Sequence, residues 1–123
     1  MPEHDGNLLV LIVDDEERIA DTLSLILNQS GFDARAAYSG ETAMALARAV
    51  KPDVLISDIF MDGITGIALA LQVNKELPDC RILLYSGQSV TTDLLQSADG
   101  HQFDFLSKPV HPQAHINRLA RYA

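Results

Sequence analysis

The stretch Leu8-Leu9-Val10-Leu11-Ile12-Val13-Asp14-Asp15 sets the expected fold of the chain. Its six consecutive apolar residues are typical of a strand that is buried on both faces of a sheet. Beyond the two aspartates, apolar residues recur with the spacing of an amphipathic helix, at Ile19, Leu23, Ile26 and Leu27. A fully buried strand that leads directly into such a helix is typical of a parallel α/β sheet.

The rest of the chain repeats this alternation. Further strands are predicted over 32–38, 54–56, 82–85 and 103–106. The helix boundaries are marked by Ser39 as an N-cap, by Gly31 and Pro52 as stop signals, and by Pro112 in the first turn of the last helix. The apolar residues expected to face the sheet are Ala43, Leu46, Ala47, Val50, Ile67, Ala70, Val73, Leu77, Leu94, Leu95, Ala98, Ile116, Leu119 and Ala120. We predict a flavodoxin-like, doubly wound sheet of five parallel strands, order 2-1-3-4-5, with helices on both faces.

Length and composition restrict the class of protein. The 123 residues fit one domain over 8–122, preceded by an N-terminal extension over 1–7. The 17 acidic and 9 basic residues give a net charge of −8, which argues against direct binding of nucleic acid. We expect no signal peptide and no membrane span, because the apolar runs are short. A single cysteine, Cys80, fits a reducing, cytoplasmic location.

Polar side chains stand where four of the predicted strands end. Asp14 and Asp15 follow the first strand, Asp58 the third, Ser86 the fourth and Lys108 the fifth. The carboxyl ends of parallel strands form the usual ligand-binding edge of such a sheet. Three converging carboxylates favour a hard divalent cation such as Mg²⁺, and a lysine with a hydroxyl favours a tetrahedral oxyanion.

Each of these residues also has a plainer interpretation when taken alone. The run Asp14-Asp15-Glu16-Glu17 fits helix capping, Asp58 and Ser86-Gly87 fit turns, and Lys108 fits a solvated charge. Their coincidence at four strand ends favours one shared site. A nucleotide-binding module or small flavodoxin-like enzyme is disfavoured, because no glycine-rich phosphate loop follows the first strand.

Four short motifs together resemble the receiver domain of two-component response regulators, from about Leu8 to Tyr122. They are Val-Asp-Asp-Glu at 13–16, Ile-Ser-Asp-Ile at 56–59, Ser-Gly at 86–87 and Phe-Leu-Ser-Lys-Pro at 105–109. The resemblance implies that Asp58 accepts a phosphoryl group from the phosphohistidine of a histidine kinase in a Mg²⁺-dependent reaction. It also implies that the chain is no conventional enzyme but catalyses its own phosphorylation and dephosphorylation at this residue.

The resemblance assigns a role to each site residue. Asp15 would bind Mg²⁺ directly and Asp14 mostly through water, with Asp58 and the backbone carbonyl of Phe60 completing the protein ligands. Lys108 would pair first with Asp58 and then with the phosphate. Ser86 and the Gly87 amide would donate hydrogen bonds to the phosphate. Phe105 would turn inward on activation, and the peptide bond before Pro109 would be cis.

The resemblance also implies partners. These are a sensor histidine kinase or phosphotransfer protein, and a downstream protein target or fused output domain controlled by the face of the fourth helix, fifth strand and last helix. A phosphorylation-dependent homodimer is a further partner that it allows. Two alternatives stay open: a phosphorylation-independent adaptor with the same fold, and a receiver excised from a hybrid kinase or a DNA-binding regulator.

The chain departs from the family pattern at several positions. Asp62 stands where relatives often have proline, and we expect its carboxylate to face solvent. Phe105 lacks the hydroxyl of the tyrosine in many relatives, and 101–103 replace a common Gly-Ala-Asp run. Phe60 and Gln88 occupy positions that tune phosphoryl lifetime in the family, and a bulky Phe60 predicts slow self-dephosphorylation.

Two histidines near the C-terminus raise the question of a second metal site. His111 and His115 are four residues apart, a spacing that places both on one side of a helix. Because no third ligand accompanies them, we expect both at the surface.

Overall fold

The computed structural model describes residues 7–61, 63, 65–86, 103–107 and 112–121. Strands and helices alternate from residue 9 to residue 86, as the sequence predicts, and one more strand and one more helix are described after that. The strands are β1 (Leu9–Val13), β2 (Asp33–Ala37), β3 (Val54–Asp58), β4 (Arg81–Ser86) and β5 (Phe103–Ser107). The helices are α1 (Glu17–Gln29), α2 (Gly40–Val50), α3 (Gly66–Glu76) and α5 (Pro112–Ala120). The helix expected around 91–98 lies outside the described residues.

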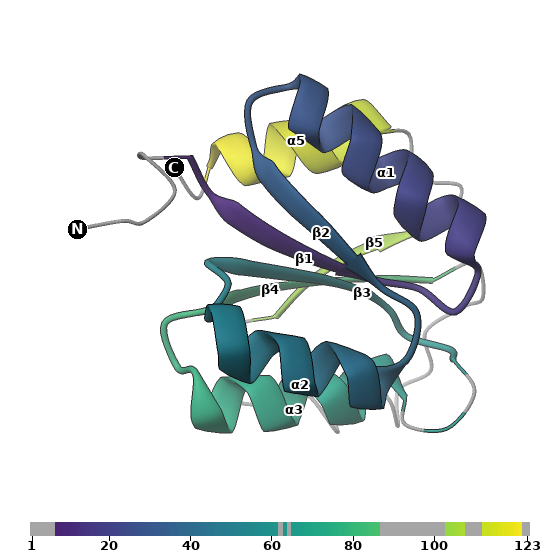
Figure 1. The fold of residues 1–123 in the computed structure, drawn as a ribbon, viewed down its shortest axis with the longest axis vertical. Coiled ribbons are helices and arrows are strands. Elements are labelled where there is room, and N and C mark those ends of the chain that lie inside the picture. The colour runs from purple at the N-terminus through teal and green to yellow at the C-terminus, as the bar shows by residue number, and fades with distance from the viewer. Residues whose placement is uncertain (1–6, 62, 64, 87–102, 108–111, 122–123) are drawn as a thin grey trace.

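The sheet confirms the predicted topology. Its strands are ordered β2-β1-β3-β4-β5, and every neighbouring pair is parallel. In Figure 1, α1 and α5 cover one face of the sheet and α2 and α3 cover the other. The carboxyl ends of β1, β3 and β4 therefore lie at one edge, where Val13 pairs with Ser57 and Asp58 pairs with Tyr85.

The core consists of two apolar layers, one on each face. All five residues of β1 are buried, as expected for a strand covered on both sides. Leu11 and Val13 pack with the α2 and α3 side, whereas Val10 and Ile12 pack with the α1 and α5 side. This alternation with a period of two fixes which side chains at the strand ends point to which face.

The helix ends follow the local signals. Ser39 Oγ accepts the Thr42 amide at 3.1 Å and caps α2, as predicted. Gly31, with φ of 98°, follows the end of α1 in a left-handed conformation that suits glycine. Within the described ranges, every helix is too short or too polar to span a lipid bilayer.

The inner face of α5 differs from the expectation. His115 and Leu119 are its buried residues, and Ala120 is exposed. The expectation of a surface His115 is therefore wrong, because its side chain is only 2% exposed. Its imidazole packs edge-on against the Tyr85 ring, with ring centroids 5.6 Å apart and planes at 79°. His111 lies outside the described residues.

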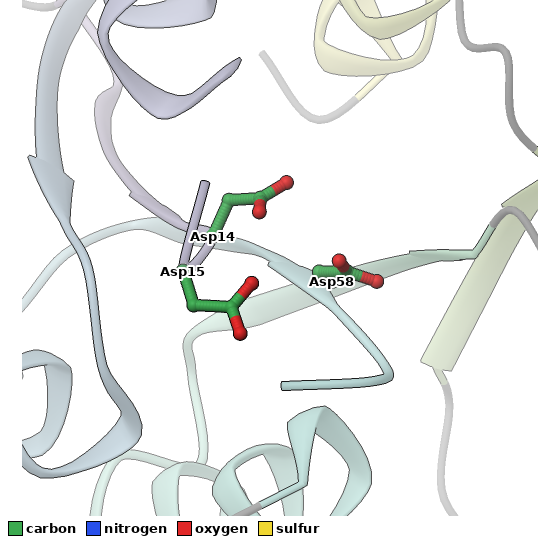
Figure 2. Close-up of side chains that lie close together, drawn as sticks. All are labelled: Asp14, Asp15 and Asp58. Atoms are coloured by element: carbon green, nitrogen blue, oxygen red, sulfur yellow. The ribbon is translucent and has the colours of Figure 1, made fainter. Parts of the chain in front are cut away.

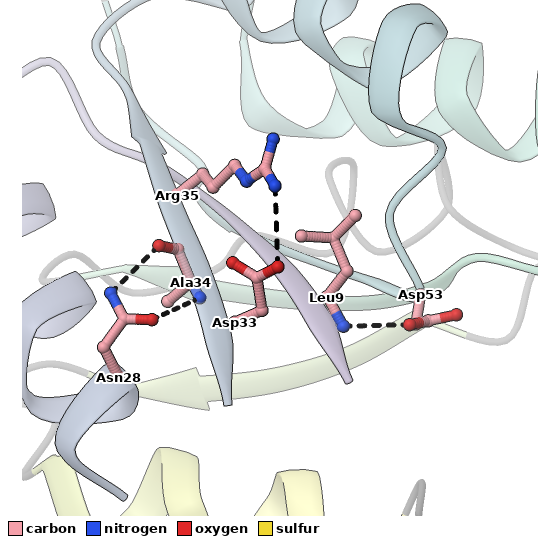
Figure 3. A network of polar contacts seen from close by, with 6 residues as sticks. All are labelled: Leu9, Asn28, Asp33, Ala34, Arg35 and Asp53. Atoms are coloured by element: carbon pink, nitrogen blue, oxygen red, sulfur yellow. Dashed lines mark hydrogen bonds and ion pairs between the residues drawn. The ribbon is translucent and has the colours of Figure 1, made fainter. Parts of the chain in front are cut away.

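Polar contacts join the elements at the amino ends of the strands (Figure 3). The Asn28 side chain, on α1, donates to the Ala34 carbonyl at 3.1 Å and accepts the Ala34 amide at 2.8 Å. The Asp53 carboxylate, just before β3, accepts the Leu9 amide at 2.8 Å. These contacts satisfy backbone groups of the edge strand β2 and of the first residue of β1.

Candidate functional site

Three aspartates meet at the carboxyl edge of the sheet and form the acidic cluster (Asp14, Asp15 and Asp58). Asp14 and Asp15 follow the last residue of β1, and Asp58 is the last residue of β3. One carboxylate oxygen from each lies within 4.8 Å of the others. Figure 2 shows the three side chains close together, with the Asp14 carboxylate above and the Asp15 carboxylate below in this view and Asp58 beside them. The structure thus brings three of the predicted site residues together.

Asp14 is the most enclosed member of the cluster. Its side chain is 0% exposed. The Glu16 amide donates to Asp14 Oδ1 at 2.9 Å, and the Tyr85 hydroxyl donates to Asp14 Oδ2 at 2.6 Å. Because both oxygens accept a hydrogen bond, the carboxylate has one defined orientation. Asp14 does not act as the N-cap of α1, a position that Glu16 takes without a side-chain capping bond.

Asp58 is also buried, with 6% of its surface exposed. Its Oδ1 accepts the Phe60 amide at 3.3 Å, and its backbone carbonyl accepts the Ser57 hydroxyl at 2.9 Å. The first residue of α3, Gly66, packs directly on this carbonyl. A Cβ atom at Gly66 would overlap the Asp58 oxygen and lie 2.8 Å from the Asp58 carbonyl carbon. The absence of a side chain at Gly66 therefore lets α3 begin against the peptide of Asp58.

Asp15 differs from the other two aspartates because its side chain is exposed. A solvent-facing carboxylate beside two buried ones gives the cluster an open side. Three carboxylates at this distance repel one another unless a cation lies between them. Their hard oxygen atoms suit Mg²⁺ better than softer transition metals. The arrangement can therefore bind a divalent cation next to the buried Asp58 carboxylate.

Tyr85 is a part of the site that the sequence interpretation missed. It is 2% exposed, and its ring lies on the α1 and α5 side of the sheet. Burial, together with the hydrogen bond to Asp14 and the nearby carboxylates, raises the pKa of the Tyr85 hydroxyl, so the group stays protonated and donates. The available signal was a phenol at the end of the apolar run 82–84, since a buried hydroxyl needs a partner.

Of the other predicted site residues, the structure describes only Ser86, Phe60 and Phe105. Ser86 ends β4 and pairs in register with Ser107 of β5, so its backbone lies at the edge of the sheet that carries the acidic cluster. Phe60 and Phe105 are half-buried and pack against the apolar layer of α2 and α3. The predicted roles of Gly87, Lys108 and Pro109, and the expectations for Asp62, Gln88 and 101–102, concern residues outside the described ranges.

Comparison with known proteins gives consistent matches. The family model described as "Response regulator receiver domain" matches residues 10–120. The probable transcriptional regulatory protein TcrX of Mycobacterium tuberculosis is 28% identical over 120 residues, which cover 97% of this chain and 51% of TcrX. The chain thus spans about half the length of the curated relatives it matches.

Solved structures agree with the family match. The chemotaxis protein CheY4 of Vibrio cholerae superposes with a TM-score of 0.83 at 27% identity, covering 96% of this chain and 100% of CheY4. The response regulator protein TrrA of Thermotoga maritima, solved in complex with Mg²⁺ and BeF, gives a TM-score of 0.82 at 26% identity. That match covers 94% of this chain and 99% of TrrA.

Proposed function

The chain belongs to the response regulator receiver domain family, and from this premise we propose that Asp58 is its phosphoacceptor. The observation that carries the proposal is the acidic cluster, in which Asp58 is buried and lies beside two further carboxylates. Burial removes competing water from the nucleophile, and the sheet holds it in one position. The function is that of a signalling switch in a two-component system.

Mg²⁺ is the proposed cofactor of this reaction. The donor set fits it, because all the candidate ligand atoms are oxygens and one side of the acidic cluster is open. Asp15, exposed, would bind the ion directly, and Asp58 and the Phe60 carbonyl would complete the protein ligands. Asp14, whose oxygens already accept two hydrogen bonds, would act mostly through water. When bound, the ion would neutralise charge on the transferring phosphoryl group.

The chemical step is an in-line displacement at phosphorus. An Asp58 carboxylate oxygen forms the new O–P bond while the N–P bond of the donor phosphohistidine breaks and the imidazole leaves. The chain's contribution is positioning and charge neutralisation. We assign Lys108, the Ser86 hydroxyl and the Gly87 amide to the phosphoryl oxygens, and we assign Ser86 and Phe105 to the later conformational switch, with a cis bond before Pro109.

The proposed partners follow from the family and from the relatives. The phosphodonor is a sensor histidine kinase or a phosphotransfer protein in the cytoplasm. Relatives of about twice this length are called DNA-binding response regulators. We therefore propose that this domain, through the face of the fourth helix, β5 and α5, controls a fused output domain or a separate protein, or forms a phosphorylation-dependent homodimer. The acidic chain itself does not contact nucleic acid in this scheme.

Acetyl phosphate tests the proposal without a kinase. The chain is incubated with acetyl phosphate and Mg²⁺, and its intact mass is measured. We expect one added phosphoryl group in the wild type and in the control variant Asp79→Asn, whose parent side chain is exposed and lies outside the acidic cluster. The addition should be absent in Asp58→Asn and in the wild type with EDTA. No addition to a folded wild type would overturn the proposal and favour a phosphorylation-independent adaptor.

A further inference from the structure

We propose that Tyr85 is a positioning residue of the metal site, whose hydroxyl holds the Asp14 carboxylate in the orientation that Mg²⁺ binding requires. This inference rests on the proposed function of the acidic cluster. Three contacts of Tyr85 support this role: its backbone carbonyl with Ile59, its hydroxyl with Asp14 and its ring with His115.

The backbone of Tyr85 lies beside the phosphoacceptor. Tyr85 and Asp58 are direct neighbours in the pairing of β4 with β3. The Tyr85 carbonyl accepts the amide of Ile59 at 2.9 Å, so it also fixes the peptide that follows Asp58. The main chain of Tyr85 is therefore tied to β3 at the point where the acidic cluster begins.

The side chain of Tyr85 reaches past β3 to the end of β1. Since β3 lies between β1 and β4, the hydroxyl crosses one strand to reach Asp14 Oδ2 at 2.6 Å. Both groups are buried, and this hydrogen bond gives the hydroxyl an acceptor and the carboxylate oxygen a donor. With the Glu16 amide on Oδ1, the two donors prevent rotation of the Asp14 carboxylate about its last bond. Partners that orient metal-binding carboxylates in this way commonly contribute 10- to 100-fold to metal affinity.

The ring of Tyr85 packs against α5. Its edge-to-face contact with His115 places α5 directly behind the phenol. Leu119 of the same helix belongs to the same apolar layer as Tyr85. The ring therefore has little freedom, and the hydroxyl position is set by the packing of α5 on the sheet. A rigid donor can hold Asp14 in place, which a solvent-exposed hydroxyl could not.

Magnesium titration of the 123-residue chain tests the inference. The substitution Tyr85→Phe removes the hydroxyl and keeps the ring against His115. Tyr38→Phe is the matched control, because the exposed Tyr38 hydroxyl also donates to a carboxylate, Asp21 Oδ1, at 2.5 Å. Calorimetric titration with Mg²⁺ should give a dissociation constant about tenfold higher for Tyr85→Phe and unchanged for Tyr38→Phe.

The unfolding midpoint in urea without Mg²⁺ is measured for the same three proteins. An unchanged or lower Mg²⁺ dissociation constant for Tyr85→Phe would overturn the inference, and a lower unfolding midpoint in that case would assign the hydroxyl to the fold alone. If the wild type itself binds no Mg²⁺, the proposed function of the acidic cluster fails instead. The two failures are therefore distinguished by the wild-type titration.

Discussion

His115 should make the fold sensitive to mild acid, and this effect can be isolated with one substitution. The imidazole is 2% exposed, and none of the described residues is a hydrogen-bond partner of its Nδ1. Burial lowers the pKa of His115 from 6.5 to about 4, because the charged form cannot be solvated against Tyr85 and Leu119. The replacement His115→Leu removes the titrating group and leaves an apolar side chain of similar size in its place.

The magnitude follows from the difference between the folded and unfolded pKa values. The unfolded chain takes up a proton near pH 6.5, whereas the folded chain takes it up only near pH 4. As pH falls through this window, the unfolded state binds more protons and gains stability relative to the folded state. Each pH unit corresponds to about 1.4 kcal/mol, so wild type should lose about 2 kcal/mol between pH 7.5 and 5.0 through this group.

Urea denaturation of both proteins at several pH values between 7.5 and 5.0 provides the measurement. All other titrating groups are shared, so the difference in unfolding free energy between wild type and His115→Leu reports His115 alone. That difference should shift by about 2 kcal/mol in favour of the variant as the pH falls. A difference that stays constant across this range would show that His115 titrates alike in both states and would refute the reasoning.

Three further predictions concern the site and the edge strand. Gly66→Ala should lower the free energy of unfolding, measured in urea, by about 2 kcal/mol and should weaken Mg²⁺ binding, because the added Cβ overlaps the Asp58 carbonyl. An unchanged free energy of unfolding and unchanged Mg²⁺ affinity would contradict the close packing. Asn28→Ala should lower the free energy of unfolding by about 1 kcal/mol and speed hydrogen exchange of the Ala34 amide, measured by NMR. Unaltered exchange would argue against the two hydrogen bonds between the Asn28 side chain and Ala34. Phe60→Asn should shorten the lifetime of the phosphorylated chain, followed by intact mass after removal of acetyl phosphate; an unchanged decay rate would exclude Phe60 as a screen against water.

The strands and their order could be predicted because the signals are local and repeated. A five-residue strand buried on both faces, such as β1, has no polar position that would allow another arrangement. The Ser39 cap also depends only on residues three apart. The meeting of Asp14, Asp15 and Asp58 followed from topology alone, since the carboxyl ends of parallel strands share one edge.

What could not be predicted depends on contacts between distant residues. The hydrogen bond from Tyr85 to Asp14 joins positions 71 residues apart, and the sequence marks it only by a phenol next to an apolar run. The buried His115 was missed because Ile116, Leu119 and Ala120 also form an acceptable helical face. The two faces share Ile116 and Leu119 and differ in whether His115 or Ala120 is buried, and packing of His115 against the Tyr85 ring decides between them.

The amino and carboxyl edges of the sheet carry different kinds of polar contact, and this separation matters for engineering. The side-chain contacts of Asn28 and Asp53 tie backbone groups together at the amino edge, whereas the acidic cluster occupies the opposite edge. The effects of substitutions on the free energy of unfolding usually add when the sites are far apart and share no partner. We therefore expect substitutions at the amino edge to change the free energy of unfolding with little effect on Mg²⁺ binding by the acidic cluster, so the two edges can be varied separately.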